Sequence, residues 1–81
     1  MKAKIFVTLK NGILDPQGRA IQQSLHTLGF STVEEVRIGK LMELELNETD
    51  MTSAENKIKA MCDTLLANTV IENYQYEILA T

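Results

Sequence analysis

The sequence predicts a small α+β domain, in which strands and amphipathic helices follow one another along a single chain. Residues 2–10 and 70–79 alternate between apolar and polar side chains, which is typical of half-buried strands. Residues 52–67 repeat apolar side chains at steps of three and four, which indicates a helix. The 81 residues allow one domain, assigned to 1–81, with a core so small that self-association is an expected source of further stability.

The composition argues against a nucleic-acid-binding protein and against a membrane protein. Eight Lys and Arg against eleven Asp and Glu give a net charge of −3, and the cations are scattered, which disfavours nucleic acid as a partner. No apolar run is long enough to span a membrane, and the first residues do not form the apolar region of a signal peptide. The lone Cys62 cannot form an intrachain disulfide, which is consistent with a reducing compartment. We therefore expect a cytoplasmic protein with no membrane contact.

The first strand and the first helix carry clear signals. In residues 2–10 the even positions are polar except for Phe6, an aromatic on an otherwise polar face. Asp15 is the expected N-cap of the helix, and Pro16 suits its first position because the missing N–H needs no partner there. Gly29 is the expected terminator. One stripe of this helix gathers its small and apolar side chains: Ala20, Ile21, Ser24, Leu25 and Leu28.

Residues 33–46 contain two extended runs separated by Gly39-Lys40. A tight hairpin at this dipeptide is the preferred interpretation. The alternative is one long strand with a glycine bulge at Gly39. A second helix is predicted from about Thr52 to Ala67, with Thr52 or Ser53 as its N-cap, followed by a strand over residues 70–79.

The predicted order is β-α-β-β-α-β, the split β-α-β or ferredoxin-like arrangement. It implies a four-stranded antiparallel sheet with both helices on one face. The other face must meet solvent or a partner. Phe6 and Leu41 are predicted to lie on that outward face, so we expect a dimer that buries it.

No catalytic constellation is evident. His26 lies on the polar side of the first helix without a second histidine nearby, so a surface role is expected. Cys62 falls on the apolar stripe of the second helix and is interpreted as a core residue. Gly39-Lys40 lacks the upstream glycine of a phosphate loop, and Asp15 is favoured as a cap over an anion site because it is itself negative. We predict no catalytic, cofactor or metal residue.

Three segments together resemble a known family. They are VTLK (residues 7–10) leading to LDPQG (14–18), then VRIGK (36–40), and finally the stretch from Met61-Cys62 through LLAN (65–68) to VIENY (70–74). In order and nearly without gaps, they resemble PurS, the small subunit of formylglycinamide ribonucleotide amidotransferase. The acidic loop at 47–52 matches least, and nothing is inferred there.

The resemblance implies a role in purine biosynthesis within an ATP-dependent, glutamine-using C–N ligase. In such complexes a synthetase subunit, PurL, binds ATP, magnesium and the ribonucleotide, and a glutaminase subunit, PurQ, releases ammonia. PurS-like chains form homodimers or tetramers that bridge the two and support ammonia transfer. The resemblance therefore implies that this chain binds no cofactor and carries out no bond chemistry itself.

Candidate interface residues follow from these motifs. Lys10, Arg37 and Lys40 lie at predicted strand ends and turns inside the matching segments, so we expect them at partner contacts, with solvated cations as the alternative. Phe6 and Leu41 complete the set as subunit-interface residues. Competing classes are a ferredoxin-like effector-binding regulatory domain, an RRM-type RNA binder and an acylphosphatase-like enzyme. The RNA binder lacks stacking aromatics, and the acylphosphatase lacks an anion-binding loop with arginine.

Overall fold

The computed structural model describes residues 1–79 and confirms the α+β class. Its elements are β1 (Lys2–Leu9), α1 (Pro16–Thr27), β2 (Lys40–Glu45), α2 (Met51–Met61), a π-helical turn η1 (Cys62–Leu66) and β3 (Glu72–Leu79). The strands form one antiparallel sheet in the order β2-β1-β3, with Ile5 of β1 opposite Met42 and Tyr76. The prediction of four strands is not confirmed, because within residues 1–79 the sheet has three.

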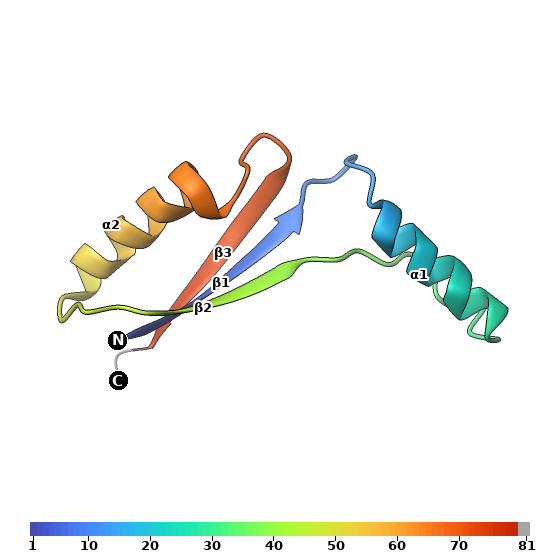
Figure 1. The fold of residues 1–81 in the computed structure, drawn as a ribbon, viewed down its shortest axis with the longest axis horizontal. Helices are drawn as coiled ribbons and strands as arrows, with labels where there is room; N and C mark the ends of the chain where they lie inside the picture. Colours follow the sequence, from blue (N-terminus) through green and yellow to red (C-terminus); the bar gives the residue numbers. More distant parts are fainter. Residues whose placement is uncertain (80–81) are drawn as a thin grey trace.

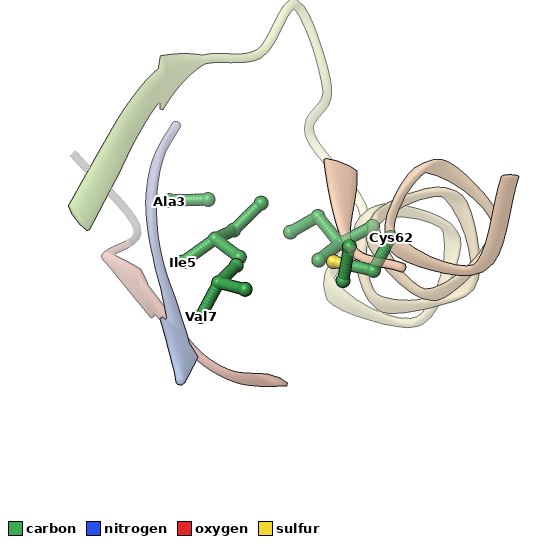
Figure 2. Packing of buried hydrophobic residues seen from close by; sticks show 6 residues of the cluster. Ala3, Ile5, Val7 and Cys62 are labelled. Carbon is green, nitrogen blue, oxygen red and sulfur yellow. The ribbon is translucent and has the colours of Figure 1, made fainter. Parts of the chain in front are cut away.

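The core lies between this sheet and α2. Ala3, Ile5 and Val7 project from β1 toward the helix, and each is at most 1% exposed. Ile58 and Cys62 meet them from the helical side, as Figure 2 shows for the cluster around Cys62. Half-buried side chains of the flanking strands complete the cluster, including Met42, Leu44, Leu46, Tyr74, Tyr76 and Ile78. The predicted period of two in the strands is therefore confirmed on this face.

The starts of both helices are capped by aspartates. The Asp15 carboxylate accepts from the Gly18 amide at 2.8 Å, and Pro16 occupies the first helical position, as predicted. At α2 the predicted caps Thr52 and Ser53 are wrong. Asp50 takes that position and accepts from the Ser53 amide at 2.9 Å, which places both predicted residues inside the first turn.

The ends of the helices follow the sequence signals only partly. Gly29 adopts a left-handed φ of +100° just beyond α1, a conformation that favours glycine and ends a helix. The second helix reaches residue 66 rather than Ala67, and its last five residues form the wider π-helical turn η1. Ala67 leaves the helix in an extended conformation, and its amide still bonds to the Cys62 carbonyl at 3.1 Å.

Only α2 covers the sheet. In Figure 1, α1 lies beyond the end of the sheet, on the opposite side of the molecule from α2. Its partner is the extended segment that continues β2 away from the sheet: the Gln22 side-chain amide donates to the Glu34 carbonyl at 2.7 Å, and His26 Nε2 lies 2.7 Å from the Val33 carbonyl oxygen. The prediction of two helices on one face is therefore wrong. We call residues 16–38, which comprise α1 and this segment, the arm.

The hairpin predicted at Gly39-Lys40 does not form within the chain. Residues 33–38 do not belong to the sheet, and Gly39 has no positive φ, which a tight two-residue hairpin turn of this type requires. Glycine serves a different purpose here. A Cβ at this position would lie 2.8 Å from the Val7 carbonyl oxygen, so only glycine lets the chain pass this close to β1.

The chain is extended for its size. Its radius of gyration is 16.3 Å, whereas a compact domain of this length has about 12 Å. Its accessible surface is 6019 Å², against about 4,900 Å² for a compact protein of this mass. The open arm explains the difference, because the predicted apolar stripe of α1 is left uncovered, with Ile21 42% and Leu28 72% exposed.

Candidate subunit interface

Lys10 and Arg37, two of the three candidate cations, lie close together between the end of β1 and the arm. The Arg37 guanidinium donates to the Ile13 carbonyl at 2.7 Å and to the Lys10 carbonyl at 3.2 Å, and its Nε lies 3.9 Å from Glu35 Oε1. Arg37 therefore ties the loop after β1 to the arm. These contacts lie within the chain, so the expected partner contact of Arg37 stays a prediction.

Lys40 and Lys10 lie at the same end of the sheet. The Lys40 ammonium is 3.8 Å from Glu72 Oε2, which links the first residues of β2 and β3 across the sheet. The Lys10 amide donates to the Ile71 carbonyl at 2.8 Å and so extends the β1–β3 pairing by one step. Because Lys40 remains largely exposed, this pair contributes little to stability and leaves the ammonium available for a contact.

The two apolar candidates are neighbours on the sheet. Phe6 of β1 is directly opposite Leu41 of β2 in the register, on the face turned away from α2. Leu41 is 53% exposed and Phe6 is half-buried. Charged residues of both signs surround this pair along the strands, with Lys4 opposite both Glu43 and Glu77.

Asp15 has a second role that capping signals alone do not indicate. Its Oδ2 accepts from the Ile38 amide at 2.7 Å, while Oδ1 caps α1. The Ile38 bond, followed by the Gly18 bond, holds the pKa of this carboxyl below its usual 3.8. Gly18 lies close against the extended segment, since a Cβ there would overlap the Val36 carbonyl.

Two grooves border these contacts. One of about 450 Å³ runs between α1 and residues 35–37, and most of the residues in its walls are polar or charged, among them Arg19, Gln22, His26 and Arg37. A second, of about 400 Å³, lies where the arm leaves the sheet, and its walls are mainly apolar: Val7, Leu9, Ile13, Leu14, Ile38 and Ile71. Asp15 and Pro16 border both grooves.

Cys62 and His26, the two side chains most often used as catalytic groups, lie in environments typical of structural residues. Cys62 is fully buried, and burial, with a smaller contribution from Asp63, raises the pKa of its thiol, which disfavours the nucleophilic thiolate. His26 is exposed on α1 and bonds to the Val33 carbonyl, which confirms a surface position. Among residues 1–79 no three His, Cys, Asp or Glu side chains are grouped as a metal site requires. No described helix is long and apolar enough to cross a membrane.

The structure contains a polar contact between Tyr74 and Asp63 that the sequence pattern does not predict. The Tyr74 hydroxyl donates to Asp63 Oδ1 at 3.0 Å, joining β3 to η1. This hydrogen bond to a charged acceptor raises the pKa of Tyr74 above its usual 10.0. The two residues are eleven apart, and only the π-helical turn brings Asp63 over the strand, so periodicity could not have paired them.

Several large apolar side chains are exposed to solvent, in two separate parts of the molecule. Leu14 and Leu28 lie at the two ends of α1 and are 83% and 72% exposed. Leu65, within η1, and Val70, in the connection from η1 to β3, are 82% and 80% exposed. Contact surfaces often expose large apolar side chains, so these residues are candidates for subunit contacts.

The structure is a small α+β domain with one three-stranded antiparallel sheet and large apolar side chains exposed at several places. The family model for PurS, phosphoribosylformylglycinamidine (FGAM) synthase, matches residues 2–80. The chain therefore belongs to the PurS family, as the sequence motifs indicate. It is a PurS subunit of a glutamine-dependent ligase of purine biosynthesis.

Individual relatives agree along almost the whole chain. The PurS subunit from Bacillus subtilis is 49% identical over 77 residues, which are 95% of this chain and 90% of the relative. The Synechocystis PurS subunit is 52% identical over the same length, covering 77% of that protein. Among solved structures, B. subtilis PurS superposes with a TM-score of 0.85 at 50% identity, over 94% of each chain. A chain of the PurLQS structure from Thermotoga maritima gives 0.86 at 31% identity, over 96% of this chain and 95% of that one.

Proposed function

We propose that this chain is the non-catalytic subunit that bridges a PurL synthetase and a PurQ glutaminase and supports ammonia transfer between them. The observation that carries the proposal is the likeness to a chain of the T. maritima PurLQS structure along nearly the full length of both. The two separate groups of exposed apolar side chains, on α1 and beside η1, give one small subunit more than one contact surface.

The physical benefit of such a bridge is local concentration. Ammonia released at one active site reaches a second site at high effective concentration only when both sites are held in one assembly that excludes bulk water. The chain needs no reactive group for this role. ATP and magnesium belong to the synthetase in this proposal, and the assembly works in the cytoplasm, where the buried free thiol of Cys62 stays reduced.

Self-association is the second part of the proposal. The extended shape and the uncovered stripe of α1 support a homodimer, because burial of about 1,100 Å² per chain would bring the exposed surface to that of a compact protein. The Phe6–Leu41 face, Lys10, Arg37 and Lys40 then remain for contacts with the other subunits or for a tetramer. We expect one domain, residues 1–81, in each copy.

Charge reversal tests the partner contacts. The variant with Lys10→Glu and Lys40→Glu should weaken assembly with PurL and PurQ on a sizing column and in a pull-down, because both cations lie at one end of the sheet. Arg37 is left intact because it holds the arm. Lys59→Glu, on an exposed position of α2, is the control for reversal of a surface charge away from this end of the sheet. Equal assembly by the wild type and the double variant would remove these residues from the interface.

A further inference from the structure

We infer that Arg37 is a positioning residue: it fixes the angle between the arm and the sheet, and with it the spacing of the surfaces through which the chain bridges its partners. The inference rests on the bridging role of the proposed function and names the side chain on which the geometry of the bridge depends. Arg37 acts through the backbone of the loop after β1, and this role needs no contact between Arg37 and a partner subunit.

The arm is joined to the sheet by two short passages of chain. One is the loop of residues 10–15 after β1, and the other is Gly39, which leads from the arm into β2. Because α1 lies beyond the end of the sheet, the sheet does not hold the helix in place by packing (Figure 1). A rigid body joined at two points can still turn about the line through them, so a further contact is needed to fix the angle of the arm.

Arg37 supplies this contact with one guanidinium group. Its Nη1 donates to the Ile13 carbonyl at 2.7 Å, and its Nη2 donates to the Lys10 carbonyl at 3.2 Å. The side chain is only 36% exposed, although it belongs to the open arm. The N–H groups of a guanidinium form a planar, rigid fork, so two such bonds define the orientation of the group as well as its position.

The backbone that Arg37 binds is itself a closed turn anchored to the sheet. The Ile13 amide donates to the Lys10 carbonyl at 3.2 Å, so residues 10–13 form a β-turn. Gly12, the third residue of this turn, has a φ of +84°, which is typical of a type II turn and favours glycine. The Lys10 amide donates to the Ile71 carbonyl at 2.8 Å, directly before β3. Hydrogen bonds therefore run without a break from the arm through the turn to the sheet.

The arm is held together on the other side of this contact. The Asp15 carboxylate accepts from the Ile38 amide at 2.7 Å and from the Gly18 amide at 2.8 Å, which joins the extended segment to the first turn of α1. Arg37 directly precedes Ile38 in the chain. The contact of Arg37 with the turn therefore orients the helix as well as the extended segment.

The angle of the arm sets the spacing of the two groups of exposed apolar side chains. Leu14 and Leu28 lie at the ends of α1, whereas Leu65 and Val70 lie in and beside η1, on the part of the molecule that contains the sheet. Linked surfaces engage two partners together only when their geometry fits both. Small misplacements in a reacting assembly cost large factors in rate. A fixed angle should therefore matter more for ammonia transfer than for binding through either surface alone.

Distances between spin labels test the structural part of this inference. Nitroxide labels at Gln23→Cys on α1 and Asn56→Cys on α2 report the angle of the arm, and an excess of unlabelled chain removes distances between copies from the signal. The buried Cys62 takes no label. Arg37→Lys keeps the charge but loses the fork, so it should broaden the distance distribution. Arg19→Lys, the same exchange at an exposed position of α1, should leave the distribution as in the wild type. An unchanged distribution in Arg37→Lys would overturn the inference.

Titration of the unlabelled variants into PurL and PurQ tests the consequence for the reaction. At saturating concentrations of the chain, Arg37→Lys should lower the maximal glutamine-dependent rate by about 3–10-fold and leave the ammonia-dependent rate unchanged. Arg19→Lys should match the wild type in both rates.

The other outcomes separate this inference from the bridging role. If Arg37→Lys reached the wild-type maximum, whether at the same or at a higher concentration, the positioning role would be overturned and the bridge would stand. A shift in concentration alone would identify Arg37 as a direct contact with a partner. If the wild-type chain itself failed to raise the glutamine-dependent rate, the bridge would be contradicted, and the positioning role with it.

Discussion

Asp15 and Ile38 are joined by a hydrogen bond of 2.7 Å between the carboxylate Oδ2 and the backbone amide, twenty-three residues apart in sequence. The same carboxylate caps α1 through the Gly18 amide. One side chain thus starts the helix and fastens the extended segment beside it. This double contact explains why α1 and residues 33–38 form one arm, even though neither packs onto the sheet of its own chain.

The charge of Asp15 should make the arm sensitive to acid. Because the folded-state pKa is lowered below 3.8, the contribution of this carboxylate is complete above that value and is lost as pH falls through the lowered pKa. Asp15→Asn keeps a capping side chain but removes the charge. Melting temperatures measured between pH 7 and pH 2 should show the wild type more stable at neutral pH, with the difference shrinking in acid. A difference that is constant over this range would contradict the account.

Gly18→Ala should loosen the arm from within. The added methyl group would overlap the Val36 carbonyl, so helix and segment must move apart. Overpacking of this kind costs about 1–3 kcal/mol of unfolding free energy, measured by denaturant unfolding of the full chain. Gln17→Ala, one position earlier on an exposed site, is the control and should stay within about 0.5 kcal/mol of the wild type. Equal stabilities of the two variants would refute the close contact.

Cys62 should be unreactive in the folded protein. It is 0% exposed, and burial raises the pKa of its thiol, so little thiolate exists at pH 8. Alkylation should proceed at least about 100-fold more slowly than in denaturant, where local burial is lost. The comparison uses iodoacetamide and mass spectrometry on the same sample before and after unfolding. Rapid modification of the native chain would show that the core around Cys62 opens easily.

The bond between Tyr74 and Asp63 should be visible in a tyrosine titration. Tyr74 donates to a carboxylate, which raises the pKa of its phenol, and Asp63→Asn removes that charge while leaving an acceptor. The absorbance titration should therefore shift to lower pH in Asp63→Asn. Tyr74→Phe, which leaves Tyr76 as the remaining tyrosine, identifies which part of the curve belongs to Tyr74. An unchanged curve in Asp63→Asn would mean that the bond is absent in solution.

Local signals in the sequence predicted most of the elements. Strand periodicity identifies the buried face with Ile5 and Val7, and Asp15-Pro16 marks the start of α1, because these features depend on neighbours in the chain. The cap of α2 is harder to predict because three residues that can cap a helix, Asp50, Thr52 and Ser53, lie close together. The choice among them depends on where the chain leaves the preceding loop.

The arrangement of the arm could not be read from the same signals. A Gly-Lys dipeptide between alternating runs favours a hairpin, but the backbone at Gly39 is decided by its distance to Val7 on another strand. The second hydrogen bond of Asp15 joins residues that are twenty-three positions apart, so no periodic pattern in the sequence predicts it. The apolar stripe of α1 predicted a buried helix face, whereas Ile21 and Leu28 are exposed in the structure.

Glutamine-dependent and ammonia-dependent synthesis test the central claim most directly. Purified PurL and PurQ would be assayed for formylglycinamidine ribonucleotide with either nitrogen source, with and without this chain. A bridging subunit raises the glutamine-dependent rate strongly and leaves the ammonia-dependent rate of the synthetase nearly unchanged, because free ammonia needs no transfer. If the chain changed neither rate, or raised both equally, the bridging role would be contradicted.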